Sequence, residues 1–292
     1  MSNYQIISDS SCDLPEITRK ELDIDLVPYS VTFDSKKYYK EIVEIKPKEF
    51  YERIVQEKLF PKTSLPSIQD YIDIFEKYLS KGIDILCMCL TAKFSGSYQS
   101  ACNAKQILSE TYPERQIEIF DTIQATGGQG LVVYEAARMK NTGYSMQELI
   151  EKLNKLKQTA RINFTVDSLD HLQKGGRIGK ASALAGTILN IKPIITMQNG
   201  ELIPYSKVRG RKKALKAIID MTADEILQQK EDYQICLINA YRIEDVTEVK
   251  KVLTQDYNFT ILEPIWDVGV TIGTHAGPTA VGICYIKKFE TL

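Results

Sequence analysis

Residues 84–108, DILCMCLTAKFSGSYQSACNAKQIL, join a short apolar run to a helical segment through a loop of small polar residues. The run from Ile83 to Leu90 has the length and composition of a core strand. The segment that follows it opens a helix. A strand followed at once by a helix is the building unit of α/β proteins, so this stretch predicts that fold class.

The same order of strand and helix extends from the beginning of the chain to residue 160. We expect strands at Tyr4 to Ser8, Leu26 to Phe33 and Ile117 to Asp121. The helices between them have recognisable starts, because Pro47 suits a first helical position and two Ser/acid pairs, Ser67 with Asp70 and Ser145 with Glu148, resemble capping boxes. These signals predict helices at about 46–58, 67–81 and 145–159.

Beyond Ala160 the pattern changes and then alternates again. The expected elements are strands at 162–166, 233–239, 259–267 and 280–286, helices at 181–190, 211–230 and 244–256, and a hairpin whose tight turn is Asn199-Gly200. We therefore expect two α/β domains, residues 1–160 and 161–292, without a Gly/Ser-rich linker. The missing linker predicts a packed interface, and such interfaces favour small-molecule sites.

Composition narrows the classes of function. The 292 residues carry 37 Lys and Arg against 38 Asp and Glu, a net charge of −1, so a nucleic-acid role would need a concentrated basic face. The densest apolar run, Ile85 to Leu90, is far shorter than the roughly 20 residues that span a bilayer. Because the start MSNYQIISDSS has no features of an export signal, we expect a cytoplasmic protein without an integral membrane segment.

The six cysteines are scattered, which argues against a disulfide framework. Cys87 and Cys89 form the only close pair and face one side of the predicted strand. A closed metal site usually needs four ligands, and neither a second Cys pair nor an HxxxH motif is present. We interpret the pair as core residues and expect no metal.

Familiar cofactor and nucleophile motifs fail on inspection. TGGQG at 126–130 is not GxGxxG, and Gly179-Lys180 lacks the other residues of a P-loop. There is no GxSxG elbow, and His171 and His275 are the only histidines. We expect no cofactor.

Small hydroxyl residues after the strand at 83–90 are the first candidates for a site. Ser95, Gly96 and Ser97 lie at or near a helix N-terminus, where free N–H groups and the helix dipole favour an anion. Gly96 permits close approach of the backbone, and Ser95 adds a hydroxyl donor. The alternative is that Ser95 or Ser97 simply caps the helix.

Three further residues stand in loops that could hold a ligand. Thr63, in KTSLPS, has no local structural role once Ser67 is assigned as a cap. Arg177 follows two glycines in LQKGGRI and offers a planar fork for a carboxylate or phosphate. His275 lies in the Gly/Pro-bracketed loop THAGPT. An ordinary loop threonine, a surface turn and a structural loop histidine are the respective alternatives.

Together these segments resemble the DegV family of bacterial fatty-acid-binding proteins, which includes the FakB subunits of fatty acid kinase. The resemblance covers nearly the whole chain: ISDSSCDLP, LVPYSVTF, KTSLPS, FSGSYQSA, IFDT followed by TGGQG, LDHLQKGGRI, LNIKPI, KVRGRKKA and THAGPTAVG occur in order. The chain departs from the family pattern at Leu65, Ser97 and Thr279, where Gln, Thr and Gly are usual.

The resemblance implies a long-chain fatty acid in a deep apolar pocket at or near the interface of the two domains. It implies that Thr63 and Ser95, with the Gly96-Ser97 segment, meet the carboxylate. It also implies a partner, an ATP-dependent kinase subunit that phosphorylates the bound acid, with Arg177 and His275 around the head group. On this interpretation the chain is a carrier rather than an enzyme.

Two other functions stay open at this point. A Ser-dependent acyl hydrolase would use Ser95 with His275. A nucleic-acid-binding regulator would use the basic run at 207–216, KVRGRKKALK.

Overall fold

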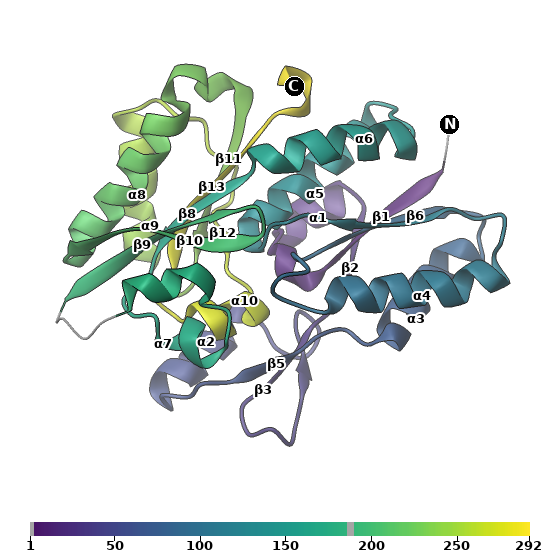
Figure 1. Cartoon of the computed structure of the whole chain (residues 1–292), viewed down its shortest axis with the longest axis horizontal. Helices are drawn as coiled ribbons and strands as arrows, with labels where there is room; N and C mark the ends of the chain where they lie inside the picture. Colours follow the sequence, from purple (N-terminus) through teal and green to yellow (C-terminus); the bar gives the residue numbers. More distant parts are fainter. Residues whose placement is uncertain (1–2, 186–189) are drawn as a thin grey trace.

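Two large β-sheets and one small sheet organise the chain in the computed structural model, which describes residues 3–185 and 190–292 (Figure 1). The four-stranded sheet is entirely parallel and has the order β2-β1-β6-β7. Its strands are β1 (Tyr4–Asp9), β2 (Ile24–Val27), β6 (Asp84–Cys89) and β7 (Ile117–Asp121). The predicted mixed α/β class is confirmed.

The six-stranded sheet takes its strands from the second half of the chain, in the order β10-β9-β8-β13-β11-β12. Neighbours are antiparallel except β11 and β12. The strands are β8 (Arg161–Thr165), β9 (Ile191–Gln198), β10 (Glu201–Arg209), β11 (Tyr233–Asn239), β12 (Trp266–Asp267) and β13 (Val281–Lys287). The predicted hairpin joins β9 to β10, and both turn residues, Asn199 and Gly200, have positive φ.

The small antiparallel sheet has the order β4-β3-β5 and lies beside the other two (Figure 1). Its strands are β3 (Ser30–Thr32), β4 (Tyr39–Lys40) and β5 (Lys62–Ser64). β5 carries Thr63, which pairs with Val31 of β3. A candidate site residue is thus fixed by a strand rather than left in a loop.

The helices of the first half include three that the sequence predicts from their start signals. They are α1 (Glu16–Glu21), α2 (Pro47–Gln56), α3 (Ile68–Leu79), α4 (Ser97–Thr111), α5 (Thr126–Asn141) and α6 (Met146–Leu156). The capping boxes at Ser67 and Ser145 are both formed. The helices of the second half are α7 (Asp170–Lys174), α8 (Arg211–Ile226), α9 (Ile243–Gln255) and α10 (Val270–Ala276).

Helix α5 packs between the two large sheets, and its glycines make this possible. A Cβ on Gly127 would lie 2.7 Å from Ile238 of β11, and one on Gly128 would lie 2.8 Å from Ile162 of β8. A Cβ on Gly130 would lie 2.4 Å from the carbonyl oxygen of Cys12. TGGQG is therefore a close-packing segment in this fold.

Four predicted elements differ from the structure. The strand expected at 26–33 is divided between β2 and β3 of different sheets, since Pro28 between them has no N–H to donate to a ladder. The strand expected at 259–267 shortens to β12, because Pro264 interrupts the run and Phe259 packs into the core beneath α9.

The prediction of an apolar helix at 181–190 is also wrong for those of its residues that the structure describes. A 3₁₀ helix, η3 (Gly179–Leu184), occupies its beginning, and residues 186–189 of the prediction lie outside the described residues. Only Ala181 of η3 is buried, so its apolar composition does not form one continuous packed face. The helix expected at 211–230 ends at Ile226 and continues as a 3₁₀ helix, η4 (Leu227–Asp232).

The division into domains at residue 160 stays a prediction. The two large sheets take their strands from opposite sides of this residue, whereas the principal core cluster contains buried side chains from both. Within residues 3–185 and 190–292, none of the helices has both the length and the apolarity needed to cross a membrane.

Candidate functional site

A cavity of about 130 Å³ lies between the two halves of the chain. Its wall is mainly apolar and comes from the six-stranded sheet, from the loop after β6 and from α10. The apolar side chains are Leu65, Leu90, Phe94, Ala125, Ile162, Phe164, Leu172, Met197, Leu202, Ile238, Val268, Ile272, Ala276 and Ala280. Such a wall suits a hydrocarbon chain, because every methylene removed from water is favourable.

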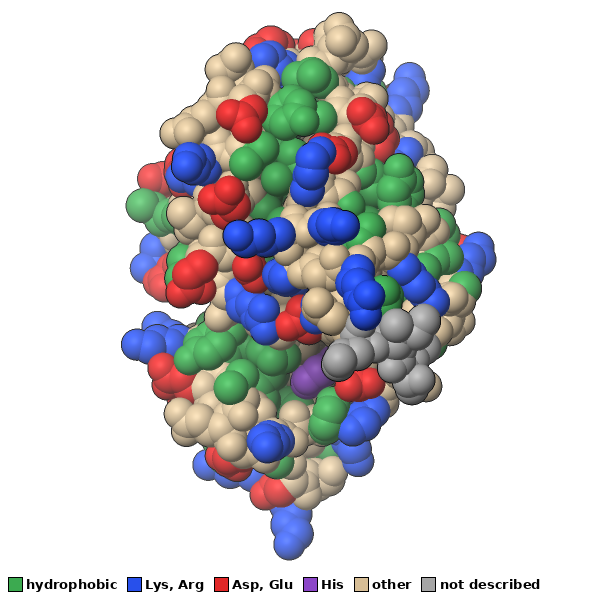
Figure 2. Space-filling model, turned by 90° about the vertical axis from the view of Figure 1, so that its left-hand side faces the viewer, with side chains coloured by type: hydrophobic (Ala, Val, Ile, Leu, Met, Phe, Trp, Pro, Cys, Tyr) green, Lys and Arg blue, Asp and Glu red, His purple; other side chains and the backbone are tan. Residues whose placement is uncertain are grey.

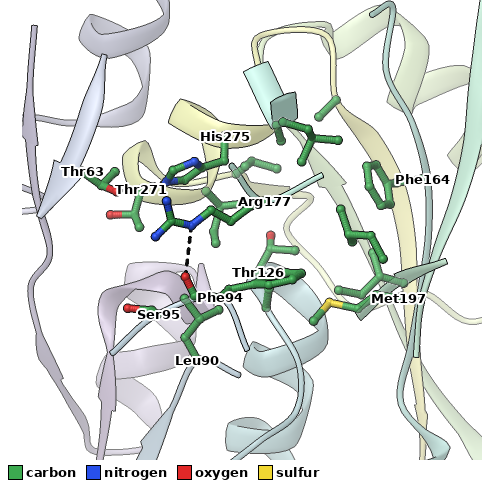
Figure 3. A pocket seen from close by; sticks show the side chains of 18 of the residues that line it. Thr63, Leu90, Phe94, Ser95, Thr126, Phe164, Arg177, Met197, Thr271 and His275 are labelled. Atoms are coloured by element: carbon green, nitrogen blue, oxygen red, sulfur yellow. Dashed lines mark hydrogen bonds between the residues drawn. The ribbon is translucent and has the colours of Figure 1, made fainter. Parts of the chain in front are cut away.

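Polar groups gather on one side of this cavity. Figure 3 shows Thr63, Arg177 and His275 close together, with Phe164 and Met197 on the opposite side. The remaining polar lining residues are Tyr29, Ser95, Thr126 and Thr271. The cavity therefore has a polar end, defined here as Thr63, Ser95, Arg177 and His275, and an apolar remainder.

Thr63 and His275 form one pair at the polar end, with Oγ1 3.0 Å from Nε2. Burial, the Arg177 charge and His171 lower the pKa of His275 to about 4, so the ring is neutral at neutral pH. Its Nδ1 is buried without a hydrogen-bond partner among the described residues and faces Gly175. An unpaired acceptor costs less there than an unpaired N–H, so the proton belongs on Nε2, which donates to Thr63. The Thr63 hydroxyl is then left to donate into the cavity.

Ser95 is held by two donors. The Tyr29 hydroxyl donates to Ser95 Oγ at 2.8 Å, and the backbone N–H of Ser97 donates to the same oxygen at 3.2 Å. Tyr29, in the short segment that joins β2 to β3, is buried. Ser95, just before α4, is only partly buried. The expected role of Ser95 near the helix start is thus compatible with a second role as a donor.

Arg177 links the two halves of the chain at the polar end. Its Nε donates to the carbonyl oxygen of Phe94 at 3.1 Å, drawn as the dashed line in Figure 3, and Nη1 donates to that of Gly175 at 2.7 Å. These bonds fix the guanidinium plane, and the other N–H groups of the fork stay available to a ligand.

Gly96 and Ser97 do not belong to the residues that line the cavity. Gly96 is exposed at the N-terminus of α4, and a Cβ there would lie 3.3 Å from the lining residue Leu65. Ser97 is fully buried and donates through Oγ to Asp9 at 2.8 Å. A direct contact of the Ser97 side chain with a ligand stays a prediction, and its observed bond serves the buried network behind Ser95.

Two buried carboxyl groups lie behind the cavity wall. The Thr126 hydroxyl donates to Asp13 at 2.6 Å, and the Thr271 hydroxyl donates to Glu41 at 2.7 Å. Burial, followed by the proximity of Glu41, raises the pKa of Asp13 well above its usual range. The two threonines therefore satisfy buried acids with their hydroxyl groups.

Sequence reasoning missed Tyr29, Thr126 and Thr271. Tyr29 lies in LVPYSVTF and Thr126 opens TGGQG, segments that have no local sign of a ligand. Thr271 lies one helical turn before His275 on α10, and that spacing is the signal that could have indicated it. Among residues 3–185 and 190–292, no group of three or more His, Cys, Asp or Glu side chains is placed to hold a metal ion.

Fold and site together define an α/β protein with a mainly apolar cavity between the two halves of the chain and hydrogen-bond donors at one end of it. A family model described as "Uncharacterised protein, DegV family" matches residues 3–288. The chain belongs to the DegV family.

Relatives of known structure share the entire fold. A stearic-acid-binding protein from Eubacterium ventriosum is 37% identical with a TM-score of 0.94, over 99% of this chain and all of that one. DegV from Bacillus subtilis, described as a fatty acid binding protein, is 30% identical with a TM-score of 0.86, over 99% and 100% of the two chains. A DegV domain-containing protein from Clostridium acetobutylicum is 33% identical over 291 residues, 99% of this chain and all of the relative.

Proposed function

We propose that this protein binds a long-chain fatty acid, with the hydrocarbon tail against the apolar wall and the carboxylate at the polar end. The observation that carries the proposal is one cavity that combines an apolar wall with the hydroxyls of Thr63 and Ser95 at one end. The stearic-acid-binding relative from Eubacterium ventriosum and the fatty-acid-binding DegV from Bacillus subtilis support the same ligand class.

The energetic balance fits a carrier. A chain of about 16 carbons gains roughly 0.8 kcal/mol per buried methylene, about 12 kcal/mol before the cost of association. A hydrogen bond to a charged group contributes only about 1.5–3 kcal/mol. The tail therefore sets the affinity, and the polar end sets the orientation.

Analysis of the lipid that copurifies with the protein tests this proposal. Denaturing the purified protein and extracting it into organic solvent should release about one long-chain acid per chain, identified by mass spectrometry. A lipid-free preparation that also fails to bind added palmitate or oleate would contradict the proposal.

We propose further that the protein presents the bound carboxylate to a separate ATP-dependent kinase subunit for acyl-phosphate formation. His171 lies on α7 and His275 on α10, beside the polar end, and Figure 2 shows several Lys and Arg side chains, with some Asp and Glu among them, on a face that includes a histidine. A basic face suits an acidic or phosphate-bearing partner. Arg177 would stabilise the negative charge that develops during phosphoryl transfer.

Variants at the polar end and in the basic run test the presentation role. Arg177→Ala and His275→Ala should retain palmitate within about tenfold, yet form acyl phosphate far more slowly with a fatty acid kinase subunit and ATP. Lys251→Ala, at an exposed position of α9 away from the cavity, is the matched control. Charge reversal at the exposed Lys212 and Lys213 should raise the concentration needed for half-maximal turnover. Wild-type rates in both alanine variants would contradict this role.

The geometry favours neither alternative function. His275 is paired with Thr63 and Ser95 accepts from Tyr29, so the nucleophile and base of a hydrolase are not hydrogen-bonded to each other. In the basic run, Arg211 forms an ion pair with Asp245 at 2.9 Å and Lys216 one with Asp220 at 2.5 Å. Two of its cations therefore already have a carboxylate partner within the chain.

A further inference from the structure

The Ser95 hydroxyl has no acceptor capacity left for a ligand. An alcohol oxygen has two lone pairs and one proton. Here the lone pairs receive the Tyr29 hydroxyl at 2.8 Å and the Ser97 N–H at 3.2 Å. The single hydrogen-bonding function that remains is the proton, and Ser95 lines the cavity. Ser95 therefore meets a ligand as a donor.

The neighbouring polar groups, Arg177 and Thr63, also face the cavity as hydrogen-bond donors. Arg177 offers donors and no acceptor. With Nε2 of His275 as the donor, the Thr63 oxygen accepts this bond and its own proton is free for the cavity. A head group with N–H or O–H donors finds no acceptor on Ser95 or Arg177. A head group with two acceptor oxygens can accept hydrogen bonds from both.

We propose that the polar end selects acyl ligands with an acceptor-only, anionic head group, and that Tyr29 is the positioning residue that makes Ser95 a donor. The inference rests on the proposed function and deepens it, because it names the chemical form of the ligand. A carboxylate or an acyl phosphate meets the donors with oxygen atoms only. A fatty amide of equal length brings an NH₂ group, whose donors oppose those of Ser95 and Arg177.

Tyr29 acts on the ligand through its hydrogen bond to Ser95, which a phenylalanine at this position cannot make. Its ring is buried, with 2% of the residue exposed, so Tyr29→Phe keeps the packing and removes the hydroxyl alone. The loss frees one lone pair on Ser95, which can then accept a hydrogen bond from an amide. The discrimination between acid and amide should therefore fall, beyond any general weakening of binding.

Competition between two matched ligands tests this inference. Delipidated protein is incubated with equal amounts of palmitate and palmitamide, and the bound fraction of each is measured by mass spectrometry, beside the affinity for palmitate alone. The wild type should prefer palmitate at least about tenfold. Tyr29→Phe should weaken palmitate about 2- to 10-fold, which corresponds to one hydrogen bond, and should lower the preference for the acid. Tyr38→Phe, an exposed tyrosine with 48% of the residue accessible, is the control.

A double-mutant cycle separates positioning from direct contact or general structure. In the Ser95→Ala background, Tyr29→Phe should change neither the affinity nor the preference. If its effect persists there, the positioning role is wrong. Equal binding of palmitate and palmitamide by the wild type would overturn the selection of anionic ligands while leaving the carrier function intact. Failure of the wild type to bind palmitate at all would instead overturn the proposed function.

Discussion

Thr63 and Ser95 each owe their direction of donation to a neighbour from a distant part of the chain. With its proton on Nε2, His275 of α10 donates a hydrogen bond to Thr63, and Tyr29 donates one to Ser95. A carboxylate at the polar end thus receives hydroxyl protons that need no rearrangement on binding. Such preorganisation lowers the entropy cost of association.

Removal of either hydroxyl should weaken fatty acid binding. In Thr63→Ala and Ser95→Ala the anion loses one donor, which costs about 1–3 kcal/mol, or about 5- to 150-fold in affinity. Titration of delipidated protein with palmitate measures the change. Ser64→Ala, at the exposed neighbouring position of β5, should bind as the wild type does. Unchanged affinity in the double variant, at constant melting temperature, would place the carboxylate elsewhere.

Asp13 and Glu41 form a buried pair of carboxyl groups, and Glu41 receives more hydrogen bonds than Asp13. A Cβ on Gly269 would lie 2.4 Å from Asp13 Oδ1 and 2.5 Å from Glu41 Oε1, so these oxygens are within about 5 Å of each other. Glu41 accepts from Ser10 and from both the hydroxyl and the N–H of Thr271, whereas Asp13 accepts from Thr126 and leaves Oδ1 unpaired. Hydrogen bonds therefore stabilise the anionic form of Glu41 better than that of Asp13, and Asp13 keeps the proton.

Asp13→Asn should preserve the fold and flatten its pH dependence. The pKa of Asp13 is raised, so the folded chain holds a proton that the unfolded chain has lost at neutral pH. This group's contribution to stability is complete below the ordinary Asp pKa and falls as the pH rises towards the folded value. Urea unfolding between pH 5 and 8 should show a smaller fall for Asp13→Asn than for the wild type. Glu41→Gln should destabilise at every pH, and a steeper fall in Asp13→Asn would contradict this assignment.

At the scale of elements, α7 and α10 hold the polar end together through one glycine. α10 carries Thr271 and His275, and its N-terminus is anchored by Glu41, which accepts the Thr271 N–H at 3.0 Å. Gly175, which ends α7, lies against His275 so closely that a Cβ would be 2.2 Å from Nδ1. The position of the imidazole therefore depends on the absence of a side chain on α7.

Gly175→Ala should disturb the polar end without unfolding the protein. Its backbone φ of −74° accepts alanine, so the main direct cost is the clash with His275, beside a tight approach of 3.0 Å to the carbonyl oxygen of His171. The ring must move and release Thr63, and palmitate affinity should fall about 2- to 10-fold, no further than in His275→Ala. Gln173→Ala, an exposed position of α7, is the control. Wild-type affinity in Gly175→Ala would show that the Thr63–His275 bond does not serve the ligand.

Elements with local signals could be predicted, and elements defined by distant partners could not. The capping serines 67 and 145 mark α3 and α6 because their bonds lie within four residues. Helix α5 was missed because most of its side chains are buried on all sides, which removes the amphipathic period. The four residues of the polar end could be named from the sequence and the family resemblance, but Thr63 lies in β5 and His275 on α10 rather than in the expected loops. Their convergence, and the part of Tyr29, depend on the tertiary fold.

At the scale of the whole molecule, the cavity lies where the hairpin β9–β10 meets the loop after β6. Glu201 at the hairpin tip pairs with Lys93 at 3.5 Å, and a Cβ on Gly200 would lie 2.5 Å from Thr91 Oγ1. Leu90 and Phe94 of that loop and Met197 and Leu202 of the hairpin line the cavity. A bound chain would therefore contact both halves at once and add to the interface between them.

Removal of the ligand should loosen both halves of this interface together. Without an acyl chain the apolar wall loses contacts, and adding palmitate at 100 times its dissociation constant should restore about 2.7 kcal/mol of stability. Hydrogen exchange of delipidated and palmitate-loaded protein measures where the change occurs. Residues 90–97 and the hairpin 191–209 should both gain protection on loading, because lining side chains come from each. Helix α9 is the internal reference, since its buried side chains belong to the second core cluster and none lines the cavity. Protection confined to one of the two segments would contradict a ligand held between them, and equal protection in α9 would indicate a global effect rather than a site.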